Sequence, residues 1–186
     1  RIYILIVFTS ILANSIYSVK AQGKHSIGIR AGYQISGLFD GTKKVAGTSN
    51  YGGFYAGVFK ENKIIPFLHW GAGLEFCKNG AGLDGGDKHV INYLGIPAYL
   101  KAKAAPVYAL AGVQPKVKIG EKIIINDELT NPTDEQKSKT FDLPAFGGVG
   151  INILIVSLET RFYYSMFETN HGARNAYWQF GATLHL

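Results

Sequence analysis

Apolar side chains alternate with small or polar ones along eight stretches of the chain, and no other sequence feature limits the possible folds as strongly. The last stretch is the clearest. Its alternate residues are Trp178, Phe180, Ala182, Leu184 and Leu186. Residues two apart share one face of a strand but lie on different sides of a helix. The pattern therefore predicts β-strands that each have one apolar face.

The connections between the eight predicted strands alternate in length. The strands are expected at 26–35, 51–60, 68–76, 90–101, 106–118, 140–151, 154–163 and 177–186. The long connections are 37–50, 78–89, 119–139 and 165–174, and the short ones between them are 61–65, 102–105 and 152–153. Strands of about ten residues joined in this way are typical of a membrane barrel with an even strand number. The expected fold class is an all-β, eight-stranded antiparallel up-and-down transmembrane β-barrel.

The polar faces of these strands indicate which side of the sheet lines the inside. They carry charges of both signs together with many glycines, whereas a water-exposed sheet surface would carry few glycines. Inside a narrow barrel, glycines leave room for long charged side chains, whose charges must then be paired. We expect a structural polar network in the lumen, made of Arg30, His69, Glu75, Lys101, Asp142, Glu159 and Arg161. A proton or ion path through the lumen is the alternative.

Aromatic and proline residues add detail to this barrel. Aromatic side chains near the strand ends are expected to form girdles at the two membrane interfaces. Pro97, Pro115 and Pro144 each remove a backbone donor from a closed sheet, so we expect strand ends or bulges at these positions. The aromatic set comprises Tyr33, Phe67, Phe76, Tyr99, Phe141, Tyr164 and Trp178.

The first residues are typical of an export signal. Arg1 precedes an apolar run, and a small-residue cleavage pattern ends at Ala21. The expected domains are a signal peptide at 1–21 and an outer-membrane barrel at 22–186, with a retained membrane anchor as the alternative. Cys77 is the single cysteine, so no disulfide forms within the chain.

The net charge argues against nucleic acid as a partner. Of the 19 basic residues, two lie in the expected signal, which leaves 17 basic against 13 acidic residues and a net charge of +4. A nucleic-acid-binding domain is usually far more basic.

Four groups of residues inside the predicted strands form motifs. They are Tyr93-Leu94-Gly95-Ile96-Pro97 with Leu100-Lys101, Pro106-Val107-Tyr108-Ala109-Leu110-Ala111-Gly112, Phe141-Asp142 with Gly147-Gly148-Val149-Gly150, and Glu159 with Arg161-Phe162. In these motifs the chain resembles the PorT-like outer-membrane β-barrel family of Bacteroidota, over nearly all of its length after the signal. The resemblance implies an outer-membrane location, insertion by the barrel-assembly machinery and, as for most members, no assigned activity. The family's namesake is linked to type IX protein secretion, and no residue here carries that role across.

The long connections hold the residues that could bind or react. No spacing among them enforces a nucleophile, a base and an orienting group, so no catalytic residue is predicted. The stretch 80–89 could hold a cation, but a solvated loop is the simpler interpretation, and neither a metal nor a cofactor is predicted. The charged connection 119–139 is a solvated loop or, alternatively, a recognition surface for a protein partner. The candidate interaction residues are Asp84, Asp87, His89, Glu121, Lys122, Asp127, Glu128 and His171.

These patterns predict a location more sharply than a role. We expect a non-enzymatic integral outer-membrane barrel with a filled lumen, short periplasmic turns and four long outer loops. Its expected role is structural or in interactions, such as an accessory to protein secretion or to an envelope complex. One alternative is a secreted soluble lipocalin-like barrel that binds a small apolar ligand. The other is a loop-based outer-membrane hydrolase.

Overall fold

A computed structural model describes most of the chain after its first 24 residues. It covers residues 25–40, 43–45, 47–83, 87–125, 128–130, 138–168 and 173–186. The expected export signal, 1–21, therefore lies outside the described residues. Over the described ranges, no helix has the length and apolar character needed to cross a membrane.

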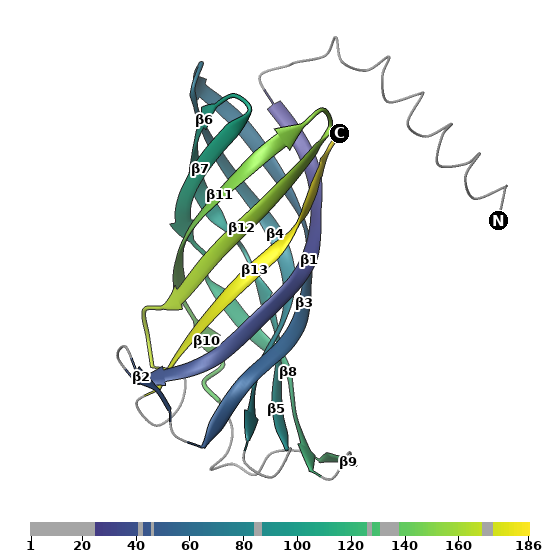
Figure 1. The fold of residues 1–186 in the computed structure, drawn as a ribbon, viewed down its shortest axis with the longest axis vertical. Coiled ribbons are helices and arrows are strands. Elements are labelled where there is room, and N and C mark those ends of the chain that lie inside the picture. The colour runs from purple at the N-terminus through teal and green to yellow at the C-terminus, as the bar shows by residue number, and fades with distance from the viewer. Residues whose placement is uncertain are drawn as a thin grey trace, which may run out of the picture.

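Antiparallel strands form one sheet that closes on itself (Figure 1). β1 pairs with β3 on one side and with β13 on the other, so the first and last long strands are neighbours. The strands are β1 (His25–Asp40), β2 (Lys43–Lys44), β3 (Thr48–Ile65), β4 (Leu68–Leu83), β5 (Lys88–Gly95), β6 (Ala98–Ala104), β7 (Val107–Val113), β8 (Lys116–Ile125), β9 (Glu128–Thr130), β10 (Phe141–Asp142), β11 (Pro144–Ile153), β12 (Val156–Ser165) and β13 (Arg174–His185).

Three of the barrel strands are interrupted at a proline. β5 and β6 are separated at Pro97, β7 and β8 at Pro115, and β10 and β11 just before Pro144. The backbone N–H of Ile96 donates to the Pro115 carbonyl, and that of Gln114 donates to the Pro144 carbonyl, each at 2.9 Å. The interruptions thus lie side by side in neighbouring strands. Since each interrupted pair is one barrel strand, the fold is the expected eight-stranded antiparallel barrel, with strand ends at the three predicted prolines.

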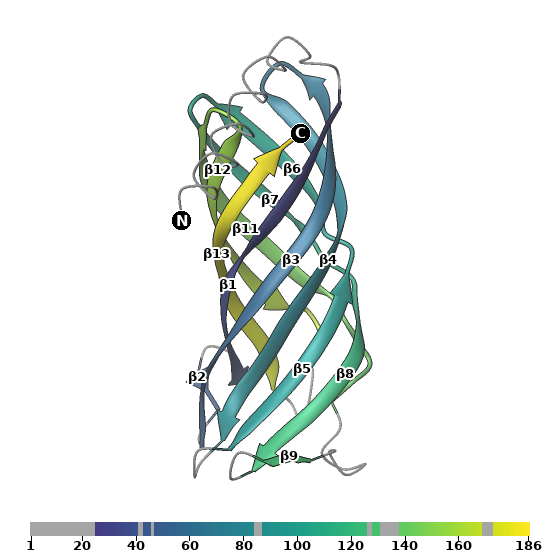
Figure 2. The ribbon, with the colours of Figure 1, turned by 90° about the vertical axis from the view of Figure 1, so that its right-hand side faces the viewer.

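The two ends of the barrel differ. Tight turns at 66–67, 105–106 and 154–155 lie at one end with the C-terminus. The longer connections lie at the other end, where β3, β4, β5 and β8 run on toward β9 (Figure 2). The short turns predicted at 61–65, 102–105 and 152–153 are wrong by several residues, because the sheet pairing continues further. Glu61 consequently belongs to β3, where it pairs with Ser26 and Gly71.

Apolar side chains surround the outside of the barrel and charged ones fill the inside. Leu74, Leu158 and Leu184 point outward and are 47%, 51% and 37% exposed, whereas Arg30 and Glu159 are 3% and 7% exposed. This arrangement confirms the predicted orientation of the two faces. It reverses the rule for soluble proteins, in which large apolar side chains are mostly buried. Such a surface suits hydrocarbon, where every backbone polar group must be paired within the sheet.

Aromatic rings gather on the outward face toward the long-connection end, as in an interfacial girdle. Tyr99, however, was wrongly expected there. It is only 6% exposed and points into the lumen, because it shares a strand face with Lys101. The outward ring pairs, with their centroid separations, are Phe54–Phe76 (5.6 Å), Phe162–Trp178 (5.0 Å), Trp178–Phe180 (6.0 Å) and Phe141–Phe167 (6.5 Å).

Candidate functional site

Among the described residues, the lumen holds a buried ionic network with equal numbers of cations and carboxylates. Each of its charged side chains comes from the inward face of a strand, and each is less than a tenth exposed. The balance means that the lumen itself contributes no net charge. The cations are Arg30, Lys101, Lys116 and Arg161, and the carboxylates are Glu61, Glu75, Asp142 and Glu159.

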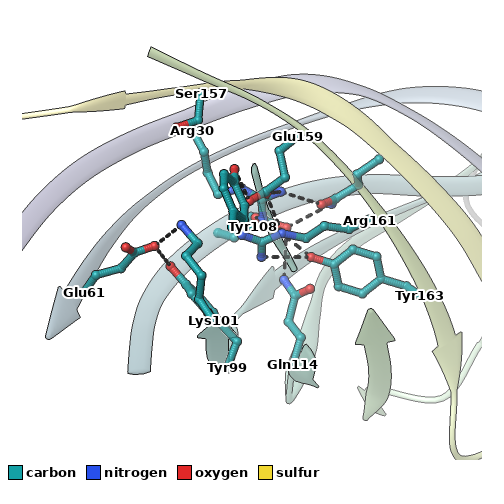
Figure 3. Close-up of polar contacts among 12 residues, drawn as sticks. Arg30, Glu61, Tyr99, Lys101, Tyr108, Gln114, Ser157, Glu159, Arg161 and Tyr163 are labelled. Atoms are coloured by element: carbon teal, nitrogen blue, oxygen red, sulfur yellow. Dashed lines mark hydrogen bonds and ion pairs between the residues drawn. The ribbon is translucent and has the colours of Figure 1, made fainter. Parts of the chain in front are cut away.

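Arg30 on β1 is the centre of this network (Figure 3). Its guanidinium donates to Glu75 on β4 and lies 3.3 Å from the Glu159 carboxylate on β12. The same guanidinium donates to Gln179 at 3.1 Å and lies 4.6 Å from the centre of the Tyr55 ring. Arg30 therefore joins strands from opposite sides of the barrel.

The two carboxylates around Arg30 have further partners. Gln114 and Gln179 donate amide hydrogens to Glu75 at 3.1 and 3.0 Å. Arg161 donates its Nε–H to Glu159 at 2.6 Å, and the Tyr108 hydroxyl donates to the same carboxylate at 2.9 Å. Buried charges are costly unless they are paired and hydrogen-bonded in this way.

A second cluster fills the short-turn end of the lumen. Glu61 accepts hydrogen bonds from Lys101 and from the Tyr99 hydroxyl, the latter at 3.0 Å, and Lys103 lies 3.2 Å from its other oxygen. Glu61 was missed because it was assigned to a turn. The signal that would have found it is the continued alternation of inward residues from Tyr55 through Glu61.

The third cluster lies toward the long connections. The Lys116 ammonium is 3.3 Å from the Asp142 carboxylate and lies over the rings of Tyr93 and Tyr177, at 4.4 and 4.5 Å. The Ser165 hydroxyl donates to the same carboxylate at 2.8 Å. Lys116 thus supplies the partner that the predicted network lacked for Asp142.

The predicted lumen residues are therefore brought together as three clusters along the barrel. His69 is the exception, because its side chain lies half-buried at the short-turn end and joins none of the clusters. Its Nδ1 atom is buried and has no hydrogen-bond partner among the described residues. Stacked aromatic rings fill space between the charges. The centre of the Tyr163 ring is 4.5 Å from that of Tyr177 and 4.7 Å from that of Phe146. The buried charges are thus paired with one another and separated by packed aromatic rings.

Two of the predicted loop residues meet just beyond the long-connection end of the apolar band. His89 on β5 lies 2.7 Å from Glu121 on β8, because the pairing of these strands places their inward faces side by side. Lys118 donates to the same carboxylate, and so does the backbone N–H of Ser138 at 2.8 Å. The Lys118 ammonium also donates to the Ser138 carbonyl at 2.6 Å. Glu121 and Lys118 thus hold Ser138, in the segment that precedes β10, by hydrogen bonds to its backbone.

The structure does not bring the other loop candidates together with His89 and Glu121. Asp87 and Lys122 border it, each with an interaction of its own. Asp84, Asp127 and His171 lie outside the described residues, and Glu128 is in β9. In the part of the chain that the structure describes, no three His, Cys, Asp or Glu side chains gather closely enough to hold a metal ion.

Substituting Glu121→Gln should loosen the segment around Ser138 while leaving the barrel intact. Burial raises the pKa of this carboxyl, but the hydrogen bonds from Lys118, Ser138 and His89 outweigh it and hold the pKa below its ordinary value. A lowered pKa contributes stability that is present above the ordinary pKa and is lost as the pH falls through the folded-state value. The protection of the Ser138 amide against hydrogen exchange, taken relative to its intrinsic rate at the same pH, should fall in the variant and, in the native chain, on acidification.

The matched control for that substitution is Glu168→Gln, which alters an exposed acid at the same end. It should leave exchange at Ser138 unchanged. Because the Glu121 cluster is partly open to solvent, the free energy of unfolding should fall by about 1 kcal/mol or less. Equal exchange rates in Glu121→Gln and the native chain would contradict the fastening role.

Comparison with known proteins supports the fold alone. No family model matches the chain, and no curated protein matches it. Among solved structures, Ail, the attachment invasion locus protein of Yersinia pestis, in complex with the heparin analogue sucrose octasulfate, has a TM-score of 0.54 at 14% identity, covering 88% of this chain and 100% of Ail. Neisserial surface protein A (NspA) has a TM-score of 0.54 at 14% identity, covering 87% and 99%. The chain is therefore similar in fold to barrels from outer membranes.

Proposed function

We propose that this chain is an integral outer-membrane barrel without a pore or an enzymatic activity, which holds its long connections outward for interactions. The apolar outer face and the closed sheet support the membrane location. The similar fold of Ail and NspA is consistent with it. In this arrangement the short turns face the periplasm, and the extensions of β3, β4, β5 and β8 face the outside.

The packing of side chains in the lumen is the main support for the proposal that the barrel has no open pore. Charged and aromatic side chains meet across the barrel at Arg30, and the Glu61 cluster joins further strands across the short-turn end. At the long-connection end, a cavity lined partly by His89 and Ser138 has a volume of about 20 Å³, roughly the space of one water molecule. Eight-stranded barrels are in general narrow enough to be filled by side chains.

A planar-bilayer recording tests this proposal. The purified chain should insert without producing a steady open conductance, because no ion can pass Arg30 without breaking its pairs with Glu75 and Glu159. A general porin measured in parallel shows that insertion gives a detectable current when a pore exists. Stable single-channel steps from the purified chain would overturn the closed-lumen proposal and favour an ion path.

Two alternatives make different predictions. A soluble lipocalin-like barrel should appear in a detergent-free supernatant, whereas the proposed barrel should stay with the membrane fraction until detergent is added. A barrel of the lipocalin type needs apolar side chains around its ligand, and here they face outward. A loop-based hydrolase should lose activity on a lipid or peptide substrate in His171→Ala.

The proposal also includes membership of the PorT-like family and three kinds of partner: the barrel-assembly machinery, outer-membrane lipid and a protein bound by the long connections. The motifs around Tyr93, Pro106 and Phe141 support membership of the PorT-like family, and the barrel-assembly machinery would then insert the chain. Outer-membrane lipid is the proposed surrounding of the apolar face. The residues most available to a protein partner are those of the long connections, since exposed loops on a rigid scaffold commonly carry binding.

A further inference from the structure

Three lysines share the outward face of neighbouring strands at the long-connection end. Lys78 is on β4, Lys88 on β5 and Lys122 on β8. We call these three residues the basic arc. Outward residues alternate with inward ones on these strands, and Lys88 and Lys122 are exposed while Lys78 is half-buried.

The register of the strands places the arc around one residue, Val90. Lys122 is directly opposite Val90, Lys88 is two residues away on the same strand, and Gly80 lies opposite Val90 two residues from Lys78. Direct neighbours across a pair are about 5 Å apart and diagonal ones about 7 to 8 Å. Val90 itself is only 5% exposed, so the surface at the centre of the arc is closed.

The arc begins where the apolar band ends. On β4 the outward residue before Lys78 is Phe76, and on β8 the outward residue before the arc is Ile119, which is 56% exposed. Phe76 belongs to the aromatic girdle through its contact with Phe54. Lys78 and Lys122 are therefore placed beside the end of the apolar band, and Lys88 lies further out, at the start of β5.

The charge around the barrel is also uneven. The lumen is balanced, so the excess of positive charge in the described ranges lies at the surface. Among the residues whose side chains the structure describes, one acid, the half-buried Asp87, is next to the arc in sequence, and three lysines with one aspartate give a net charge of +2. The exposed charged side chains among the described residues are Lys60, Lys63, Lys88, Lys122, Lys139 and Glu168.

We propose that the basic arc binds the phosphate groups of an anionic lipid in the leaflet next to the long connections. This inference rests on the proposed membrane location. Lysine is a strongly hydrated point charge that suits phosphate, and basic residues beside an apolar surface bind anionic lipid headgroups. A soluble polyanion is less well matched, because Lys78 and Lys122 lie on the side of the barrel next to the lipid-facing band and not at the ends of their strands.

Native mass spectrometry of the purified, refolded barrel tests this proposal, with diphosphoryl lipid A as the anionic probe and phosphatidylcholine as the lipid without net charge. Each lysine near an anionic lipid surface is worth roughly a fivefold change in affinity. The triple variant Lys78→Gln, Lys88→Gln, Lys122→Gln should bind diphosphoryl lipid A at least about tenfold more weakly than the native chain. The difference should shrink at high salt.

The control is the double variant Lys60→Gln, Lys63→Gln, which removes exposed lysines from the opposite rim and should change the affinity by less than about twofold. If inorganic phosphate or a heparin oligosaccharide displaces diphosphoryl lipid A from the native chain, the assignment to lipid is overturned. Equal affinity of the triple variant and the native chain would overturn it as well. Insertion into phosphatidylcholine vesicles is measured first. If the native chain inserts but shows no preference for diphosphoryl lipid A, only the lipid inference fails, whereas failure to insert overturns the membrane location as well.

Discussion

An Arg30→Leu variant should lose about 3 to 5 kcal/mol of unfolding free energy, which is the usual effect of removing one partner of a buried ion pair. Arg30 is the only cation paired with Glu75 among the described residues, and it also lies 3.3 Å from Glu159. Its loss leaves Glu75 with the amides of Gln114 and Gln179 alone. Urea titration in lipid vesicles, followed by the fluorescence of Trp70 and Trp178, measures the change.

A double-mutant cycle separates lost pairing from lost packing. Glu75→Gln alone should cost less than Arg30→Leu, because Arg30 keeps Glu159 as a partner. The combined variant Arg30→Leu, Glu75→Gln removes both charges. Its loss of unfolding free energy should therefore be well below the sum of the losses in the two single variants. Strictly additive losses would show that Arg30 stabilises the barrel through packing against Tyr55 instead of through its charge.

The strand faces were predictable because alternation depends only on the local geometry of a strand. Ile29 and Arg30 are adjacent in sequence, yet one is 46% exposed and the other 3%. No long-range information is needed to place them on opposite faces. The same holds for the three prolines, because the missing N–H of Pro97 or Pro115 interrupts the pairing wherever the strand lies in the barrel.

The partners inside the lumen were not predictable in the same way. Which inward residues meet across a barrel depends on the stagger between its strands, and alternation carries no information about stagger. Lys101 was expected in one network with Glu75, but the stagger brings it to Glu61. His89 and Glu121 were assigned to two separate loops, and the pairing of β5 with β8 brings them together.

Strand ends were the least predictable feature because the signals that mark them are weak here. The polar residues after Lys60 looked like a turn, although the pairing of β3 with β4 runs on to Ile65. Beyond the apolar band the outward face changes to glycine and lysine, for example at Gly82 and Lys88. A sheet that leaves hydrocarbon loses the apolar half of the alternation, so its extension resembles a loop.

A single arginine on the outer face should be nearly as damaging as the loss of Arg30. Val149 is 56% exposed and is one of the outward residues of the β10–β11 strand, between Phe141 and Ile153. It pairs with Ala109 on one side and Thr160 on the other. A charge placed there meets lipid without an acid to pair with, so Val149→Arg should lower the unfolding free energy in vesicles by about 2 to 4 kcal/mol.

The matched variant is Asn50→Arg, which adds the same side chain at an exposed position of β3 beyond the aromatic girdle. Near or outside the interface the cost of a charge falls to about 0 to 1 kcal/mol, so this variant should unfold almost as the native chain does. The contrast tests the location of the hydrocarbon and not merely tolerance of arginine in a strand. If both variants lose the same free energy, or if Val149→Arg folds equally well without lipid or detergent, the apolar face of the barrel does not contact a bilayer.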